Sequence, residues 1–467
     1  MNATNLKIFC SIIIGLSIYM MPIPVGLEPK AWHLFSIFVA TITAIVLKPY
    51  PMPFIALLGL LVTVLTNVLT FEEGMAGFSN QVIWLVVLVF FIARGFIKTQ
   101  LGTRLAYIFV GLLGRSTLGL GYGIAITEVL IAPFMPSNSA RTGGVMMPII
   151  QSIAETLGSS PDNGTERKLG SYLYQVTFQS NLITSAMFLT AMAANPMAQS
   201  LAAKQNVEIT WISWFVAASV PGLISLLIIP LVLYWIYPPE LKVIKNSKEF
   251  SRDQLEKLGP LSRQEKTMIG IFSLILLLWI FAKQTGIGAS TAALLGLVLT
   301  IVLKIIDWKD VMNEKEAWNT FIWLAVLVTL STYLDKFGFI SWFSQNISRF
   351  VVDWPWQKGF LFLSLCYFYS HYFFASNTAH VSSMYAAFLA VSISIGAPPL
   401  VAALLLAFFS SLFSSMTHYG TTAGAIVFGA NYVKLSDWWR IGFIVSIINL
   451  VIWICGGGLW WKALGLW

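Results

Sequence analysis

Charged residues are scarce in this sequence. They make up 10% of its 467 residues, whereas an ordinary soluble domain has about 25%. Hydrophobic residues make up 57%, and a water-soluble fold of this length could not bury so much apolar surface. The shortage of charge therefore excludes a soluble globular protein and favours a chain that lies in a lipid bilayer.

Cysteine and histidine are also rare. The three cysteines, Cys10, Cys366 and Cys455, lie far apart in apolar stretches, which excludes a disulfide framework. Three of the four histidines, His371, His380 and His418, lie in the second half with no cysteine or carboxylate at metal-ligand spacing, so we expect no metal site and no cofactor. The sequence has no glycine-rich loop ending in Lys-Ser/Thr and no acid–base constellation. These absences argue against ATP hydrolysis and against an intramembrane enzyme.

Long apolar blocks make up most of the chain. Blocks of roughly 18 residues or more are typical of transmembrane helices. Two apolar stretches, 117–157 and 358–395, are each broken by polar residues, and we interpret them as re-entrant hairpins. The sequence thus predicts an all-α integral membrane protein with about eleven transmembrane helices and two hairpins. The expected spans are 8–25, 31–48, 53–70, 80–97, 170–200, 211–236, 267–282, 289–306, 319–335, 400–430 and 438–460.

The basic residues indicate the orientation of the chain. The net charge of +8 comes from Lys and Arg in short connections and in the hydrophilic connector 238–266, so it predicts topology and not nucleic-acid binding. With a cytoplasmic N-terminus and hairpins that do not cross, 19 basic residues face the cytoplasm. This places the C-terminus outside and the protein in the cell's inner (plasma) membrane. The seven basic residues expected outside are Lys30, Lys204, Lys283, Lys336, Arg349, Lys358 and Lys462.

The sequence contains an internal repeat. Residues 80–89 and 319–328 are identical at seven of ten positions, at an offset of 239. The same offset relates Ser137-Asn138-Ser139-Ala140 to Ser376-Asn377-Thr378-Ala379. Five expected crossings separate the copies, and an odd number inverts one copy, as in secondary transporters. The expected units are an extra N-terminal helix (1–30), a first inverted repeat (31–237), a cytoplasmic connector (238–266) and a second inverted repeat (267–467).

The two Ser-Asn motifs are the strongest candidates for a binding site. Ser, Asn and Thr favour helix N-termini, and a helix N-terminus attracts carboxylates through its free N–H groups and its dipole. Two such tips that meet could each hold one carboxylate of a dianion with four or five carbons. The alternative is that both motifs only cap packed helices. The candidate substrate residues are Ser137, Asn138, Ser139, Ser376, Asn377 and Thr378.

Each half has a second polar interruption, which follows the hairpin. The first reads Thr190-Ala-Met-Ala-Ala-Asn-Pro196 and the second Thr417-His-Tyr-Gly-Thr-Thr-Ala-Gly424. Pro196, Gly420 and Gly424 allow the helices to unwind there. We add Thr421 and Thr422 to the candidate substrate residues. Polar stripes that bind one helix to another remain the alternative.

These motifs resemble the divalent anion/sodium symporter family. The resemblance rests on Pro136-Ser-Asn-Ser-Ala-Arg-Thr-Gly-Gly144, on Ser376-Asn-Thr-Ala-His380 and on 424–434, and it covers essentially the whole chain. It is closer to the antiporter branch, which includes 2-oxoglutarate/malate, citrate/succinate and tartrate/succinate exchangers. The resemblance implies substrate carboxylates at two hairpin tips, a homodimer, and a transport domain that slides against a scaffold like an elevator, with each domain drawn from both repeats.

The sequence departs from this family pattern in the second interruptions. Sodium-coupled members carry Thr-Pro-Pro-Asn, whereas Met192-Ala-Ala-Asn195 and Thr421-Thr-Ala-Gly424 stand here. This argues against sodium coupling. Arg141 and His380 follow the two motifs at the same offset, and we expect them to balance the substrate's charge in place of sodium. The alternative is that Arg141 pairs with Glu128 and that His380 is a core residue.

The function predicted from the sequence is exchange of C4/C5 dicarboxylates, such as malate, succinate, fumarate and 2-oxoglutarate, by a secondary transporter. The alternative within the same class is a sodium- or proton-coupled di- or tricarboxylate symporter. A passive channel is less compatible with twice-broken inverted repeats, which suit alternating access.

Overall fold

The structure is a computed structural model that describes residues 3–348 and 354–467. Within these residues the chain forms helices and no strand, and one isolated bridge joins Ser116 to Val243. The predicted all-α fold is confirmed. Arg349, one of the basic residues expected outside, lies outside the described residues.

The first half supplies helices from the N-terminus to residue 236. The helix that was expected over 8–25 begins and ends about five residues earlier. The bounds are α1 (Ala3–Met20), α2 (Pro29–Leu47), α3 (Met52–Leu65), α4 (Phe71–Gly74), α5 (Gln81–Lys98), α6 (Leu101–Leu113), α7 (Thr117–Ile131), α8 (Asn138–Ala140), α9 (Met147–Thr156), α10 (Gly170–Met187), α11 (Ala194–Lys204) and α12 (Trp211–Ile236).

The connector and the second half supply the rest. The bounds are α13 (Ser247–Leu258), α14 (Arg263–Ile280), α15 (Ala282–Thr285), α16 (Ala289–Val302), α17 (Trp308–Asn313), α18 (Lys315–Lys336), α19 (Phe339–Ser348), α20 (Trp356–Tyr369), α21 (Asn377–His380), α22 (Ala386–Ser394), α23 (Pro399–Leu412), α24 (Thr422–Gly429), α25 (Leu435–Val451) and α26 (Gly457–Ala463).

Several helices are suited to a bilayer. Among the described residues, seven helical segments are long and apolar enough to cross a membrane, and four shorter helices are also apolar. Large apolar side chains stay exposed on these helices, for example Leu61 on α3, Leu227 on α12 and Val298 on α16. Such exposure is costly in water and favourable against lipid tails. The number of crossings and their direction stay predictions.

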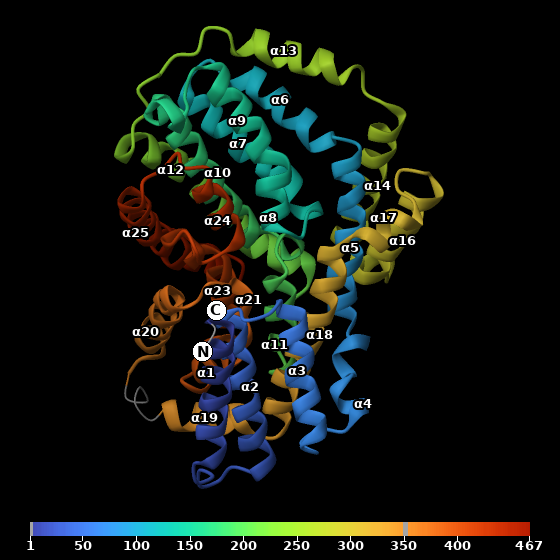
Figure 1. Ribbon diagram of the computed structural model, residues 1–467, viewed down its shortest axis with the longest axis vertical. Helices are drawn as coiled ribbons and strands as arrows, with labels where there is room; N and C mark the ends of the chain where they lie inside the picture. The colour runs from blue at the N-terminus through green and yellow to red at the C-terminus, as the bar shows by residue number, and fades with distance from the viewer. Residues whose placement is uncertain (1–2, 349–353) are drawn as a thin grey trace.

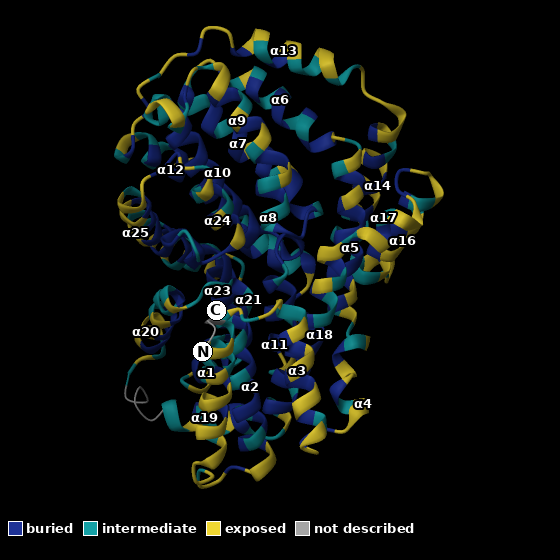
Figure 2. Ribbon diagram, viewed as in Figure 1, coloured by how far each residue is buried: buried dark blue, intermediate teal, exposed yellow. Residues whose placement is uncertain are grey.

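Two helices form the centre of the molecule. Every residue of α10 is buried, and α23, which packs against it, is buried from Val401 to Leu412. Figure 2 shows exposed positions gathered on the outer helices instead, including α13. The buried face of α10 includes polar side chains such as Asn181, Thr184 and Ser185. A buried polar group is costly unless it has a partner. The polar residues at the centre therefore indicate a functional site there.

Among the described residues, three helices of ten or more residues were not predicted from the sequence. Helix α6 and helix α19 have 13 and 10 residues, too few for the roughly 20 that span a bilayer. Helix α13 forms within the hydrophilic connector and lies across one end of the molecule (Figure 1). It packs along α6, and the Ser251 hydroxyl donates a hydrogen bond to the Tyr107 carbonyl at 2.6 Å. The connector is thus a packed element and not a free linker.

The two broken stretches have matching elements. Helices α7 and α20, α8 and α21, and α9 and α22 each begin 239 residues apart. In both stretches a π-helical segment, 141–146 or 381–385, joins the short helix to the longer one that follows. Helices α8 and α21 both lie near the middle of the long axis (Figure 1). These matches support the duplication, while the inversion of the second copy stays a prediction.

The helices are unwound within both second interruptions, 190–196 and 417–424, as predicted, with one difference in the first. The chain leaves α10 at Phe188 and enters α11 at Ala194, so Pro196 lies in the first turn of α11 and not in the break. Proline is tolerated there because the first turn of a helix has no intrahelical partner for its N–H groups. In the second half the break covers 417–421, and Gly424 lies inside α24.

Candidate functional site

One cavity brings the predicted residues together. Its volume is about 430 Å³, and it lies where α8, α21, α18 and the two second interruptions meet. All eight candidate substrate residues line it, although they come from segments up to 285 positions apart. The eight are Ser137, Asn138, Ser139, Ser376, Asn377, Thr378, Thr421 and Thr422.

The serine of each motif caps the helix that follows. The Ser137 hydroxyl accepts a hydrogen bond from the Ala140 backbone N–H at 3.0 Å, and Ser376 accepts one from Ala379 at 3.3 Å. This is ordinary N-cap geometry, so the capping alternative describes part of what the serines do. Each cap leaves other N–H groups of the first turn without an intrahelical partner, and these are donors available to an anion.

The asparagine of each motif reaches the same methionine. The Asn138 side-chain amide donates to Met192 Sδ at 3.9 Å, and the Asn377 amide donates to the same sulfur at 3.5 Å. Asn138 also donates to the Thr421 hydroxyl at 3.2 Å, and Asn377 donates to the Ser410 carbonyl at 2.9 Å. Amides from both halves of the chain therefore converge within one cavity.

Arg141 is fully buried and ion-paired. Its Nε donates to Glu128 Oε2 at 2.7 Å, and neither side chain is exposed. The guanidinium also donates to the carbonyls of Met135, Ala191 and Asn181 and to the Ser185 hydroxyl. The pairing alternative is thus what the structure shows. The pair carries no net charge, so Arg141 does not present a free cation to the cavity.

His380 lies in a stack of rings. Its ring is parallel to Phe374 and Phe413 at centroid distances of 4.4 and 4.5 Å, and it is fully buried. His380 Nδ1 lies 3.1 Å from His371 Nδ1, and its Nε2 lies 3.1 Å from the Ser370 hydroxyl. The core-residue alternative therefore describes its surroundings.

The hydrogen bonds of the histidine pair fix its protons. His371 Nε2 lies 3.0 Å from the Gly420 carbonyl, which only accepts, so this nitrogen carries a proton. In a neutral His371 the Nδ1 atom then accepts, so His380 Nδ1 is the donor between the rings. His380 Nε2 either accepts from Ser370 or, in an imidazolium, donates to it. The pair can hold one extra proton with every polar atom satisfied, whereas two would place N–H groups against each other.

The cavity also has a wall that the sequence did not reveal. Glu316, Asn319, Thr320 and Trp323 of α18 line it, together with Phe90 of α5. Asn319 is the repeat partner of Asn80, which caps α5 by accepting from the Val82 and Ile83 N–H groups. In the second half the helix begins earlier, at Lys315, so Asn319 sits inside it. The shared asparagine was the available signal, but only the fold shows its different use.

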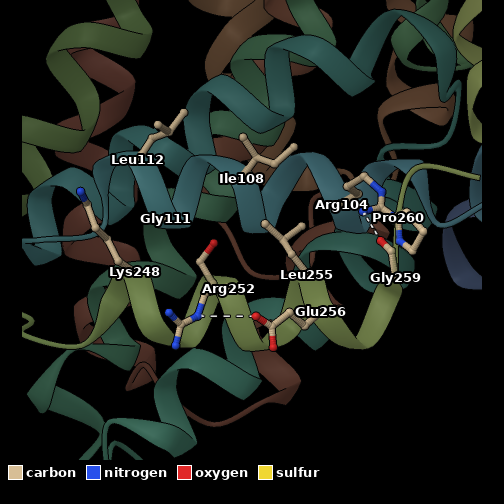
Figure 3. Close-up of a pocket in the computed structure, with 11 residues that line it drawn as sticks. Arg104, Ile108, Gly111, Leu112, Lys248, Arg252, Leu255, Glu256, Gly259 and Pro260 are labelled. Atoms are coloured by element: carbon tan, nitrogen blue, oxygen red, sulfur yellow. Dashed lines mark hydrogen bonds and ion pairs between the residues drawn. The ribbon is translucent and has the colours of Figure 1, made fainter.

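A larger groove lies elsewhere. It has a volume of about 710 Å³ and runs between α6 and α13 (Figure 3). Ile108, Leu112 and Leu255 line it with Lys248 and Arg252, and no residue of the Ser-Asn motifs reaches it. The groove therefore follows from the packing of the connector on α6, and none of the eight candidate substrate residues lines it.

The described residues contain no group of three or more His, Cys, Asp or Glu side chains placed to hold a metal ion. The two interruptions carry the hydroxyls of Thr190, Thr417, Thr421 and Thr422 and the Gly420 carbonyl, and hard cations such as sodium prefer oxygen ligands.

Curated proteins that are similar over the whole chain are named as transporters or as a membrane protein. The chain is 50% identical to the "Putative malate transporter YflS" of Bacillus subtilis over 98% of its length and 96% of the relative's. It is 46% identical to "Dicarboxylate transporter 1, chloroplastic" of Spinacia oleracea, covering 100% of this chain and 82% of the relative. It is 36% identical to the "Inner membrane protein YbhI" of Escherichia coli, covering 100% of this chain and 99% of that protein.

A solved structure supports the fold, and the family follows. The YdaH transporter of Alcanivorax borkumensis matches the whole chain with a TM-score of 0.56 at 13% sequence identity. The family described as "Sodium:sulfate symporter transmembrane region" matches residues 2–467. The expected resemblance is thereby confirmed, and the protein is a multi-pass integral membrane transporter. The chain belongs to the sodium:sulfate symporter transmembrane family.

Proposed function

We propose that the protein exchanges small dicarboxylates across the cell's inner (plasma) membrane. The observation that carries this proposal is the convergence of Asn138 and Asn377 on one cavity, because two separate amide donors suit the two ends of a dianion. Hydrogen bonds to charged carboxylates are stronger than those to neutral groups. Relatives named as malate and dicarboxylate transporters support the same substrate class.

The proposed substrates are malate, succinate, fumarate and 2-oxoglutarate. The test is counterflow in proteoliposomes, with labelled succinate outside and one unlabelled acid inside each set of vesicles. The panel contains these four acids together with citrate, tartrate and sulfate. Strong counterflow with the C4 and C5 acids and little with sulfate is the expected result. Transport of sulfate alone would contradict the substrate class.

We propose exchange, and not symport, because a fixed positive charge in the cavity region makes the empty carrier costly to reorient. Arg141 no longer supplies that charge, since Glu128 neutralises it. His380 is the remaining candidate for this charge, since the hydrogen bonds of its pair with His371 have a place for one proton, although neither ring lines the cavity.

The coupling ion is tested in the same vesicles. Malate-for-malate exchange is expected to persist when sodium is replaced by choline, and net uptake into empty vesicles is expected to be far slower. Strict dependence on sodium, or rapid net uptake, would favour the sodium- or proton-coupled symporter. Liposomes without protein serve as the control for leak.

The remaining proposals concern topology and movement. The N-terminus and the connector face the cytoplasm, the C-terminus faces outward, and a homodimer moves substrate by an elevator mechanism. Asp253 and Ser394 are exposed, so a single cysteine at each position, in a protein lacking the three native cysteines, is accessible to an impermeant thiol reagent. In whole cells, labelling at 394 but not at 253 is expected. The reverse pattern would overturn the orientation.

A further inference from the structure

Met192 lies between the two motif asparagines. Its sulfur accepts a hydrogen bond from Asn138 in the first half and from Asn377 in the second, at 3.9 and 3.5 Å. The side chain lines the cavity and is 4% exposed. If each amide holds one substrate carboxylate, the atoms that join the two carboxylates must pass beside this thioether.

The backbone on both sides of Met192 is held firmly. Thr190 donates to the Pro133 carbonyl at 2.7 Å, and Arg141 donates to the Ala191 carbonyl at 3.1 Å. On the other side, the Asn195 backbone N–H donates to the Met192 carbonyl, and its side-chain amide donates to the Phe188 carbonyl. The thioether therefore starts from a fixed point, although its own torsions are soft.

The thioether of Met192 is a group that a substrate carboxylate can readily displace from the two amides. Sulfur is a weak acceptor, so a carboxylate oxygen easily replaces it at an amide N–H. Until then the sulfur gives each amide a second acceptor, besides Thr421 for Asn138 and the Ser410 carbonyl for Asn377, which lowers the cost of keeping the amides in an empty site. After replacement the methionine is left beside the carbon chain of the substrate, where its bulk limits the length that fits.

We propose that Met192 determines the chain length of the transported dicarboxylate by filling the space between the two carboxylate sites. The inference rests on the proposed function, because it needs carboxylates at Asn138 and Asn377. Removing the side chain beyond Cβ opens room for one or two additional methylene groups. Discrimination by one methylene in an apolar pocket is typically about 10- to 200-fold, so the effect is large enough to measure.

The experiment compares exchange rates for succinate, glutarate and adipate in proteoliposomes. In Met192→Ala protein the adipate-to-succinate ratio is expected to rise at least about tenfold over wild type, because adipate is longer than the proposed C4 and C5 substrates. Met192→Leu protein keeps the bulk without the sulfur, and its ratio is expected to stay near that of wild type. Met197→Ala is the matched control, since Met197 is also buried, on the adjoining helix α11, but does not line the cavity.

Each result decides between two explanations. An unchanged ratio in Met192→Ala protein that still exchanges succinate would overturn the proposal, as would a Met192→Leu ratio shifted equally far. A wild-type protein that exchanges none of the three acids would instead contradict the proposed function itself, and this inference with it.

A second measurement uses a different variant and tests the proposal even if Met192→Ala protein does not fold. Met192→Cys, in a protein lacking the three native cysteines, is treated with a small thiol reagent with and without saturating succinate. Succinate is expected to slow the modification about tenfold or more, because the substrate chain lies against position 192. An unchanged rate, in protein shown by counterflow to bind succinate, would overturn the proposal.

Discussion

The two hairpin tips have the same backbone arrangement and differ in the side chains that hold it in place. We call these side chains the supports of the tips: Arg141 with Glu128 in the first half, and His380 with His371 in the second. Each tip has a serine cap, an asparagine that reaches Met192 and a π-helical segment behind it. Behind the first tip, the position after the motif alanine holds the buried Arg141–Glu128 ion pair. Behind the second tip, the same repeat position holds His380 in a stack of rings. Equivalent positions in the repeat thus do not imply equivalent chemistry.

Both supports reach the second interruption of their own half. Arg141 donates to the Ala191 carbonyl, next to Met192, and His371 bonds to the Gly420 carbonyl, next to Thr421. One half therefore fixes its unwound segment with a charged group and the other with an imidazole. The comparison predicts that the first half is far more sensitive to loss of its support than the second.

The largest expected effect is from Arg141→Met. Removing one partner of a buried ion pair leaves Glu128 charged and uncompensated, which typically costs about 3–5 kcal/mol. The repeat-related His380→Phe keeps the stacked ring and leaves His371 Nδ1 unpaired, which costs about 1–3 kcal/mol. Thermal unfolding in detergent, followed by the fraction of monodisperse protein, measures both.

A double variant tests the reason for that difference. Arg141→Met combined with Glu128→Leu removes both charges and is expected to recover part of the lost stability, since the orphaned charge is gone. If His380→Phe proved as damaging as Arg141→Met, the contrast between the two supports would be wrong.

The next effect concerns the donors that the two tips share. Asn138→Ala and Asn377→Ala each remove a proposed hydrogen bond to a carboxylate, worth about 1.5–3 kcal/mol, or roughly 10- to 150-fold in affinity. Both losses are expected to be similar, because both tips present the same amide. Succinate binding to purified protein measures them, and wild-type affinity in either folded variant would refute the site.

A smaller effect is expected at Gly420, where the second half contacts its support. A Cβ there would lie 2.7 Å from His371 Nε2 and 2.8 Å from the Thr417 hydroxyl. Gly420→Ala therefore overpacks this point, at a typical cost of about 1–3 kcal/mol, and displaces Thr421 from Asn138. Gly429→Ala is the matched control, because a Cβ there meets open space. Equal succinate affinity in both variants would show that His371 does not position the loop.

The smallest effect is expected from an ion pair far from the tips. Lys98 Nζ lies 2.6 Å from Asp310 Oδ2 at the exposed end of α5. Burial opposes ionisation of Asp310, but hydrogen bonds from Lys98 and the Asp307 N–H outweigh it and lower its pKa below 3.8. Lys98→Met is expected to cost at most about 1 kcal/mol at pH 7.

The pH dependence of this pair has a definite sign. A lowered carboxylate pKa stabilises the fold above the ordinary value and ceases to do so as the pH falls through the lowered one. The stability difference between wild type and Lys98→Met is therefore expected to shrink below about pH 4. A difference that grows on acidification, or one as large as that of Arg141→Met, would remove the distinction between buried and exposed charge.

The sequence predicted the tips well because their chemistry is local. Ser137 and Ser376 cap helices through bonds to residues three positions ahead, which a motif reveals. The repeat then placed both motifs at one site. Helices α6 and α19 were not predicted, because they have 13 and 10 residues and are too short to be recognised as membrane spans. Asn319 was seen as a repeat residue, but its place in the cavity depends on where α18 begins.

The sequence alone could not determine which contacts the supports behind the tips make. Glu128 and Arg141 are 13 positions apart, and both a pair and a free cation were consistent with that spacing. The His371–His380 contact depends on ring orientations that Phe374 and Phe413 determine. Met192 was part of a recognised interruption, but its contacts with both asparagines need the two halves to be packed together.

The local character of the Arg141 contacts has a consequence for biosynthesis. Every acceptor that the structure gives its guanidinium lies between Glu128 and Ala191. On the ribosome, this charge can be neutralised while the second half is still untranslated. Asn138, in contrast, waits for Thr421, which is made 283 residues later. A nascent chain that ends after the first half can therefore neutralise Arg141, yet it has no substrate site until the rest is made.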